Sequence, residues 1–278
     1  MNVLSLQSGV ALGHVGNAGA VFALARLGHQ VWRIDTVYFS NHPAHGSHRG
    51  RAGDAGEIAE LVAGLSDHGA LARCDAILSG YVGTEAVAAE VGRTVDAVRA
   101  ANPSAFYICD PAIGNDGGLF VPAGVAESVR FGLIPRADIV TPNAFELGVL
   151  TGEPVASIGD AVAAAHVVRR RGPGIVIATS VSARSGEMAT MAVEGDAVWA
   201  VTTPRLEAPM HGAGDLFAAL FLGRYLLGRD LQNALSVAVS SAFGVCHATG
   251  GAPDLALIEA QDEIVTPSRM FAAERVPA

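Results

Sequence analysis

Residues 139–151 read IVTPNAFELGVLT, and this stretch decides the fold class. Ile139 and Val140 are β-branched apolar residues, which favour a short buried strand. Residues 141–143 (TPN) then make a turn that ends in a good helix-capping residue. The apolar pattern of 143–151 predicts a helix. A strand that passes through a short turn into a helix is the first half of a βαβ unit.

The same alternation recurs along the chain. Short apolar runs predict strands at 3–6, 31–34, 76–78, 106–108, 139–140, 175–178 and 197–201. Helical patterns lie between many of them, at 16–28, 54–66, 84–100, 143–151, 157–171, 213–228 and 231–248. This order predicts an α/β fold with a mostly parallel sheet and helices on both faces. No break in composition divides 1–278, so we expect a single domain, with 33–51 as a small flap over a site.

Composition excludes several kinds of chemistry. The 278 residues carry 18 Lys+Arg against 27 Asp+Glu, a net charge of −9, and every cation is an arginine. Without lysine there is no Schiff-base catalysis, no Walker-type phosphate loop and no protein-kinase lysine. The acid excess predicts no nucleic-acid partner, and no apolar run is long enough for a membrane span. Three cysteines without paired spacing favour a reducing, cytoplasmic location.

The most specific motif is HGAGD at 211–215, followed by an apolar run. Glycines at 212 and 214 allow a tight turn whose N–H groups face an anion, and the helix that follows adds its positive end. Asp215, in the first helical turn, is positioned to take a proton from a hydroxyl group. The alternative is an ordinary glycine turn with an acidic residue at a helix start, and the five residues alone do not decide between them.

Further polar groups follow other predicted strands and therefore meet at one edge of the sheet. Asp110 follows 106–108, and Asn143 with Glu146 opens the helix after 139–140. An amide and a carboxylate three positions apart share a helix face and suit Mg²⁺ held through water beside phosphates. A capping box is the structural alternative, which this pair alone favours. The glycine loop at 13–17 lacks the Rossmann pattern and predicts close approach to a flat group.

Taken together, these motifs are recognisable. From Leu4 to about Pro267 the chain resembles the pyridoxal kinases of the ribokinase-like superfamily. The carrying segments are SGVALGHVGNAGAVFALARLG, DTVYFSNHPAHG, CDAILSGYVG, CDPAIGNDGGLFVP, ADIVTPNAFELGVLTG and HGAGDLFAALF. The resemblance implies a ribokinase-like three-layer sandwich with a mostly parallel central sheet and a small flap over the site.

On the phosphate side, the resemblance implies that Asp215 is the base for the 5′-hydroxyl of pyridoxal. It implies an anion hole for the γ-phosphoryl group at Gly212, Ala213 and Gly214. The Mg²⁺–ATP region would comprise Asp110, Thr141, Asn143, Glu146, Thr179 and Ser180. Within that region the resemblance assigns the metal to Asp110 and Glu146, and a monovalent cation, K⁺ or Na⁺, near Thr141 and Thr179.

On the acceptor side, Ser8 matches the residue that hydrogen-bonds the pyridine ring. Val37, Phe39 and Tyr81 would pack on the ring faces, as suits a flat apolar heterocycle. Pro43 stands where the family usually has a threonine, and His45 replaces a tyrosine two positions later. Asn115 stands where some members carry a metal-facing aspartate. These departures leave the preferred vitamer open.

The implied activity is ATP-dependent phosphorylation of pyridoxal to pyridoxal 5′-phosphate in vitamin B6 salvage, with pyridoxine and pyridoxamine as further candidate acceptors. The small-molecule partners are then pyridoxal and ATP, and the family pattern implies a homodimer. A hydroxymethylpyrimidine or sugar kinase of the same fold is the nearest alternative. A non-catalytic vitamin B6 binding protein is another, for which the Pro43 and Asn115 changes leave room.

Overall fold

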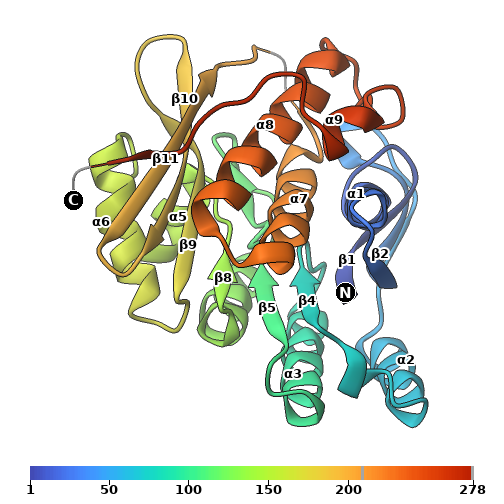
Figure 1. Cartoon of the computed structure of the whole chain (residues 1–278). Helices are drawn as coiled ribbons and strands as arrows, with labels where there is room; N and C mark the ends of the chain where they lie inside the picture. Colours follow the sequence, from blue (N-terminus) through green and yellow to red (C-terminus); the bar gives the residue numbers. More distant parts are fainter. Residues whose placement is uncertain (208–209, 277–278) are drawn as a thin grey trace.

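A ten-stranded mixed sheet forms the centre of the computed structural model, which describes residues 1–207 and 210–276 (Figure 1). Its strands, in spatial order, are β12 (Glu274–Arg275), β11 (Ala197–Pro204), β10 (Glu187–Glu194), β9 (Ile175–Ser182), β8 (Ile139–Val140), β5 (Phe106–Cys109), β4 (Ala76–Ser79), β1 (Asn2–Leu12), β2 (Gln30–Asn41) and β3 (Gly50–Ala52). The run from β9 to β2 is parallel, and the strands beyond it at both edges pair antiparallel. The expected mostly parallel sheet is confirmed.

Helices cover both faces of the sheet. One hydrophobic cluster joins the sheet to α1 (Asn17–Arg26), α7 (Ala213–Gly228), α8 (Leu231–Thr249) and α9 (Gln261–Val265). The other joins it to α2 (Ala55–Asp67), α3 (Glu85–Ala101), α4 (Ala123–Ser128), α5 (Ala144–Thr151) and α6 (Ile158–Arg169). Short helical turns lie at Pro43–His45 (η1), Leu71–Arg73 (η2), Val129–Leu133 (η3, a π-turn) and Ile134–Arg136 (η4). The three-layer sandwich is therefore also confirmed.

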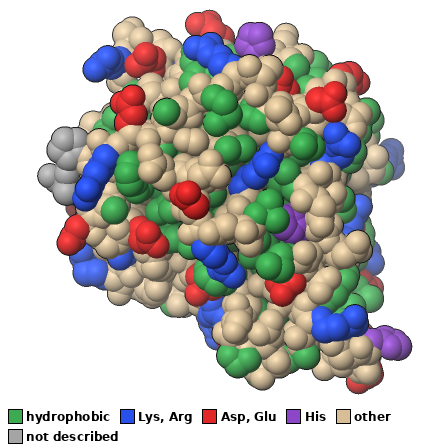
Figure 2. All heavy atoms as spheres, in the orientation of Figure 1, with side chains coloured by type: hydrophobic (Ala, Val, Ile, Leu, Met, Phe, Trp, Pro, Cys, Tyr) green, Lys and Arg blue, Asp and Glu red, His purple; other side chains and the backbone are tan. Residues whose placement is uncertain are grey.

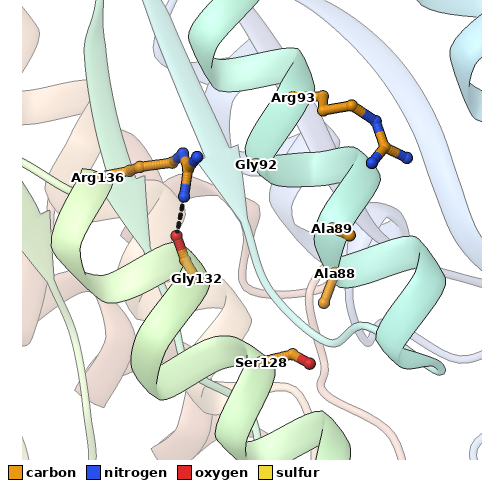
Figure 3. A pocket seen from close by; sticks show the side chains of 7 residues that line it. All are labelled: Ala88, Ala89, Gly92, Arg93, Ser128, Gly132 and Arg136. Atoms are coloured by element: carbon orange, nitrogen blue, oxygen red, sulfur yellow. Dashed lines mark hydrogen bonds between the residues drawn. The ribbon is translucent and has the colours of Figure 1, made fainter.

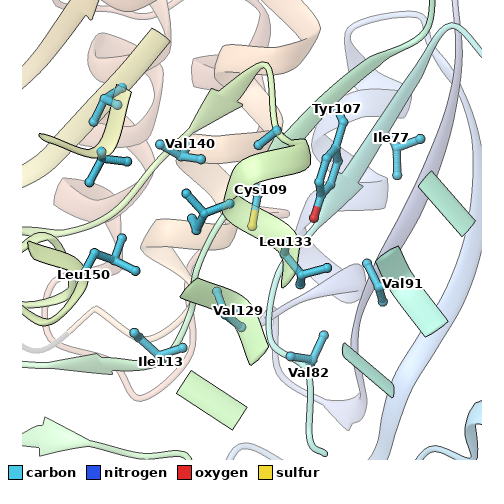
Figure 4. Close-up of a cluster of buried hydrophobic side chains, with 14 of the residues drawn as sticks. Ile77, Val82, Val91, Tyr107, Cys109, Ile113, Val129, Leu133, Val140 and Leu150 are labelled. Carbon is cyan, nitrogen blue, oxygen red and sulfur yellow. The ribbon is translucent and has the colours of Figure 1, made fainter. Parts of the chain in front are cut away.

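Helix α3 illustrates how the sequence builds these layers. Its N-cap Thr84 accepts a hydrogen bond from the Val87 amide, and buried valines follow at helical spacing through Val91, Val95 and Val98. That apolar stripe faces the sheet, where each fully buried valine or leucine contributes about 1.5–3 kcal/mol. In Figure 4, Val91 lies between Ile77 of β4 and Val82, and all three belong to the same hydrophobic cluster as Tyr107.

The expected flap at 33–51 was wrong at its start. Residues 30–41 form one strand, β2, which pairs with β1 as far as Leu12 opposite Asn41. Both strands extend past the rest of the sheet because each supplies the other's hydrogen-bond partners. Only the flap tip, which comprises residues 42–49, and the short strand β3 project beyond the paired strands β1 and β2.

A β-bulge interrupts the pairing of β1 with β2. Gln7 pairs with Asp35, whereas Gly9 pairs with Tyr38, so β2 contributes one residue more than β1 opposite Ser8. Such bulges turn a strand and re-aim its side chains. This extra residue breaks the simple alternation of buried and exposed positions along β2.

Two further segments were not expected from the sequence. Strand β10 contains two alanines and two glutamates, which are weak strand formers, so its pattern gave little signal. After α4 the chain passes through the π-turn η3, whose wider winding shifts the apolar spacing away from 3.6 residues. A small separate ribbon, β6 (Gly114–Asn115) with β7 (Gly118–Leu119), lies near the start of α5.

The surface in Figure 2 shows arginine side chains interspersed with aspartate and glutamate, as the mixed composition suggests. Among the helices of residues 1–207 and 210–276, none has the length and apolar character needed to cross a bilayer. The cysteines Cys74, Cys109 and Cys246 are buried and free.

Candidate active site

The polar residues singled out in the sequence lie where parallel strands end. Ser8 is in β1, Asp110 directly follows β5, and Thr141 directly follows β8. The start of α7 meets this edge, since a Cβ built on Gly214 would lie 3.7 Å from Asp110 Oδ2. Segments far apart in the sequence thus converge on one rim, as expected for ligand sites of open α/β sheets.

Asp215 is held by the first glycine loop. The Gly16 N–H donates a 2.7 Å hydrogen bond to Asp215 Oδ2. Burial raises the pKa of Asp215 to about 6, and the Gly16 bond acts in the opposite direction. At neutral pH the carboxylate is therefore ionised but poorly hydrated, a state suited to accepting a proton.

The turn before Asp215 depends on glycine. Gly212 caps α7 with φ 86°, and a Cβ there would lie 2.7 Å from the His14 carbonyl oxygen. The Ala213 N–H donates to the Met210 carbonyl at 3.2 Å, within the turn. Helix geometry gives the amides of the first turn, including Gly214, no carbonyl within the helix, and these donors point out of its N-terminus. The turn therefore presents donors and a positive helix end to an anion.

Two further carboxylates lie at the same rim. Burial, with the negative charges of Glu146 and Asp215, raises the pKa of Asp110 well above its usual range. Burial likewise raises the pKa of Glu146 to about 7, against the hydrogen bonds it accepts from backbone amides. Three poorly hydrated carboxyl groups near one another are costly to ionise unless a cation lies beside them.

Asn143 and Glu146 form a complete capping box. Asn143 Oδ1 accepts from the Glu146 amide and Glu146 Oε2 accepts from the Asn143 amide, both at 2.9 Å. Glu146 Oε1 also accepts from the amides of Ile113, at 2.8 Å, and Gly114, at 3.3 Å. The capping box that was the alternative to a metal site is thus present, and it fixes the Glu146 carboxylate at the rim. Glu146 is only 2% exposed, whereas Asp110 is 7% exposed and has more open surface.

The donor set fits Mg²⁺ better than a metal held by protein alone. Within the described part of the chain, no three His, Cys, Asp or Glu side chains converge on one point. Mg²⁺ usually binds one or two carboxylates and completes its shell with water and substrate phosphates. Asp110, with Glu146 behind it, matches that pattern.

The nucleotide-side residues gather beside a hollow of about 310 Å³. Asn143 and Thr179 pair through their backbones, and Ser180 follows with φ 56°. Among the residues that the structure describes, the buried Thr141 hydroxyl finds no hydrogen-bond partner. The hollow is lined by Asn115, Asp116, Gly117, Asn143, Ala144 and Ser180. Of these, Asp116, Gly117 and Ala144 were not among the expected binding residues, and the Asn-Asp-Gly-Gly turn was the only sequence signal for the first two.

The acceptor-side residues divide into those at the rim and those beneath it. Ser8 is 8% exposed, and its hydroxyl lies against Gly16, where any Cβ would overlap it. Tyr81 is half-buried and faces Phe120, with ring centroids 6.3 Å apart. Val37 is fully buried beneath Gly83, so its side chain lies under the acceptor side and is not exposed to a bound ring.

Phe39 and Pro43 are the two acceptor-side residues that lie next to or within the flap tip. Phe39 is half-buried near the outer end of β2 and packs edge-on against His48, with ring centroids 4.9 Å apart. Pro43 is exposed and begins η1. Ser8 and Asp215 meet at Gly16, whereas no contact joins Pro43 to either of them among the described interactions.

A second hollow lies away from this rim, between α3 and the segment 128–136. It encloses about 310 Å³ and is lined by Ala88, Ala89, Gly92, Arg93, Ser128, Gly132 and Arg136. Figure 3 shows Arg136 donating to the Gly132 carbonyl, and Arg136 also pairs with Asp96 while Arg93 pairs with Glu90. Both arginines are already neutralised, so we assign this hollow no function.

The fold and this site together define a small-molecule kinase of the ribokinase-like class. A parallel sheet between helical layers carries a glycine turn at a helix N-terminus, a half-buried aspartate and further carboxylates at one rim. The family model for phosphomethylpyrimidine kinase matches residues 66–243.

Comparison with individual proteins narrows the class to a family. Pyridoxal kinase PdxY of Rubrobacter xylanophilus is 44% identical over 283 residues, covering 99% of this chain and 98% of the relative. PdxY of Deinococcus radiodurans is also 44% identical, covering 99% and 96%. The structure of pyridoxal kinase from Leishmania donovani with ADP and pyridoxamine superposes with a TM-score of 0.94 at 27% identity, covering 99% of each chain. The chain belongs to the pyridoxal kinase family.

Proposed function

We propose that this protein transfers the γ-phosphoryl group of ATP to the 5′-hydroxyl of pyridoxal, giving ADP and pyridoxal 5′-phosphate. The observation that carries the proposal is the meeting of Ser8 and Asp215 at Gly16. A ring bound at Ser8 would present its hydroxymethyl group to a base at the start of α7. The names of the PdxY relatives and of the ligand-bound Leishmania donovani enzyme support the same reaction.

The chemistry follows from the proposed roles. Asp215 takes the proton of the 5′-hydroxyl as its oxygen attacks the γ-phosphorus, and the bond between that phosphorus and the bridging oxygen of ADP breaks. The amides of Gly212 and Gly214, on either side of the Ala213 amide that is bonded to Met210, stabilise the charge on the transferring group. Because the chain has no lysine, these amides and the helix end provide positive potential that a lysine would otherwise share.

We assign Mg²⁺ to Asp110, with Glu146 acting through water. The ion would supply charge neutralisation for the nucleotide phosphates. The raised pKa values of both carboxyl groups support a cation at this place. Asn115 replaces an aspartate of some relatives, so the metal would depend more strongly on Asp110.

ATP would occupy the side formed by Asn143, Thr179 and Ser180, beside the 310 Å³ hollow. The unpartnered Thr141 hydroxyl and the carbonyls near Thr179 are neutral oxygens, which suit K⁺ or Na⁺. Activity in KCl or NaCl compared with choline chloride at equal ionic strength tests this assignment, and equal rates in all three salts would reject it.

For the acceptor, we propose that Ser8 bonds the ring, Tyr81 and Phe39 contact its faces, and Val37 supports it from beneath. Pro43 has no hydroxyl to offer, so recognition would rest more on stacking than in relatives with threonine. A panel of pyridoxal, pyridoxine, pyridoxamine, hydroxymethylpyrimidine and ribose under one Mg²⁺–ATP condition tests the proposal. We expect the B6 vitamers to lead in kcat/KM by at least about tenfold, roughly 1.4 kcal/mol.

A lead for the pyrimidine or the sugar would overturn the proposed acceptor. The pyrimidine is the sharper rival because the matching family model is that of phosphomethylpyrimidine kinase. Tight binding of pyridoxal without any turnover would instead favour a binding protein.

We further propose a single-domain subunit that works as a cytoplasmic homodimer. One continuous ten-stranded sheet is consistent with a single domain. The free buried cysteines are consistent with a cytoplasmic location. Light scattering coupled to size exclusion tests the dimer, and a monomer mass at micromolar concentration would reject it.

A further inference from the structure

Two histidine contacts hold the flap tip against the opposite wall of the site. His42 stacks on His211, with ring centroids 4.7 Å apart and an interplanar angle of 28°. His45 Nε2 lies 3.2 Å from Asp254 Oδ1. His211 directly precedes the glycine turn of α7, and Asp254 follows α8, so both contacts cross from the sheet edge to the C-terminal half of the chain.

The segment that receives His45 also touches the first glycine loop. A side chain at Gly13 would overlap the Asp254 carboxylate, and His14 Nδ1 is 2.9 Å from the Leu255 carbonyl oxygen. The flap tip, the segment after α8, the glycine loop and the start of α7 are therefore joined by direct contacts. This arrangement surrounds the place where Ser8 and Asp215 meet.

The protonation state of His42 is fixed by its surroundings. Its Nδ1 accepts a hydrogen bond from the Ala44 amide at 3.2 Å, capping η1, so the neutral ring carries its proton on Nε2. Burial and the neighbouring His211, His45 and His48 lower the pKa of His42 to about 4, while Asp254 acts in the opposite direction. Near neutral pH the His42 ring in the stack is uncharged.

We propose that His42 and His211 are positioning residues for the acceptor. Their stacked rings hold the flap tip, and with it Pro43 and the end of β2 that carries Phe39, against the start of α7. This inference rests on the proposed kinase function.

Two substitutions of His211 test the stack. His211→Val removes the ring, and His211→Phe keeps an aromatic ring at this position. At pH 7.5 we expect His211→Val to raise the KM for pyridoxal about two- to tenfold, the range expected for one aromatic pair. Its kcat at saturation should stay within about twofold because positioning, not the phosphoryl step, is affected.

His211→Phe should keep the parent KM at pH 7.5, because it keeps an aromatic ring against His42. An unchanged KM in His211→Val would overturn the proposal. So would a fall in kcat without a change in KM, because that would put His211 on the phosphoryl group.

A readout without turnover keeps this test separate from the kinase proposal. Trypsin cuts only at arginine in this lysine-free chain, and Arg49 is an exposed residue of the flap tip. We expect faster cleavage at Arg49 in His211→Val than in the parent or in His211→Phe, with cleavage at exposed Arg184 unchanged as the internal control. Equal cleavage at Arg49 in all three proteins would show that the His42–His211 stack does not hold the flap tip, even if pyridoxal is phosphorylated. Faster cleavage at Arg49 in His211→Val, together with no phosphorylation of any B6 vitamer by the parent, would support the role of the stack and reject the proposed kinase function.

Discussion

The backbone amide of Gly16 donates a 2.7 Å hydrogen bond to Asp215 Oδ2, joining residues 199 positions apart in the chain. This bond orients the half-buried carboxylate and ties it to the loop that also touches Ser8. The base and the acceptor loop therefore cannot move independently. The first three predictions concern this relationship.

Replacing Asp215 with asparagine should abolish most turnover while preserving the fold. The amide oxygen can still accept from Gly16, but the side chain cannot take a proton. We expect kcat to fall by about 10²- to 10⁴-fold, the usual contribution of a general base. ADP release measured with saturating pyridoxal reports it, and Asp262→Asn, at an exposed surface carboxylate, serves as the matched control. A loss of less than tenfold would contradict the role of Asp215.

Gly16→Ala should damage both stability and activity. Gly16 has φ 55° and ψ −131°, a region strained for other residues, and a Cβ there would overlap Ser8 Oγ. Backbone strain alone costs about 1–3 kcal/mol. Gly28→Ala is the control, because Gly28 also has positive φ, 85°, but no atom within 4 Å of a built Cβ. Equal denaturant midpoints and equal KM values in the two variants would refute the importance of this contact.

Activity should fall on the acid side of pH 6. Asp215 accepts a proton only when ionised, and burial raises its pKa to about 6. Below that value kcat/KM should fall about tenfold per pH unit. A profile that stays level down to pH 5 would show that another group acts as the base.

The ligand-free protein should lose stability as pH rises from about 4.5 to about 7. Glu146 has an ordinary pKa of 4.5 when unfolded and about 7 when folded, so the folded state binds more protons in this window and its free energy of unfolding declines. Asp110 shifts in the same direction. Urea unfolding across this range tests the slope.

Asp110→Asn should make that slope shallower and reduce the stabilisation that Mg²⁺ gives at pH 7.5. Asp196→Asn, at an exposed carboxylate in the turn between β10 and β11, serves as the control for charge removal. An identical Mg²⁺ effect in Asp110→Asn and the parent would place the metal elsewhere.

The absence of lysine should protect the protein from covalent modification by its own product, pyridoxal 5′-phosphate. Pyridoxal 5′-phosphate forms imines with primary amines, and the sequence offers only the α-amino group of Met1. After borohydride reduction, peptide mass spectrometry should find label at Met1 or nowhere. Arg49→Lys, with an exposed lysine, is the positive control. A stable adduct on any other peptide of the parent would disprove this expectation.

The layers and the rim were predictable because they depend on local patterns. Alternating strand and helix signals predicted the parallel sheet, and Asp110, Thr141 and Asp215 followed from strand ends and a helix start. Such positions are set by the topology rule for parallel sheets rather than by long-range detail.

The contacts that complete the site were not predictable from the sequence. The Gly16 bond to Asp215, the stack of His42 on His211 and the approach of His45 to Asp254 join distant segments whose spacing carries no signal. The start of the flap was not predictable either, because its aromatic and histidine residues did not show that β2 continues to Asn41 alongside β1.

That bulge has a consequence for how acceptor preference can change. Because the extra residue is taken up within the bulge, Tyr38 lies opposite Gly9 and Phe39 opposite Val10, so the outer part of β2 keeps the faces set by β1. Loss of Thr36 or Val37 would leave these pairs in place and remove only the bend of the strand. An insertion or deletion at the bulge would therefore re-aim the acceptor wall while leaving each of its side chains on the same face.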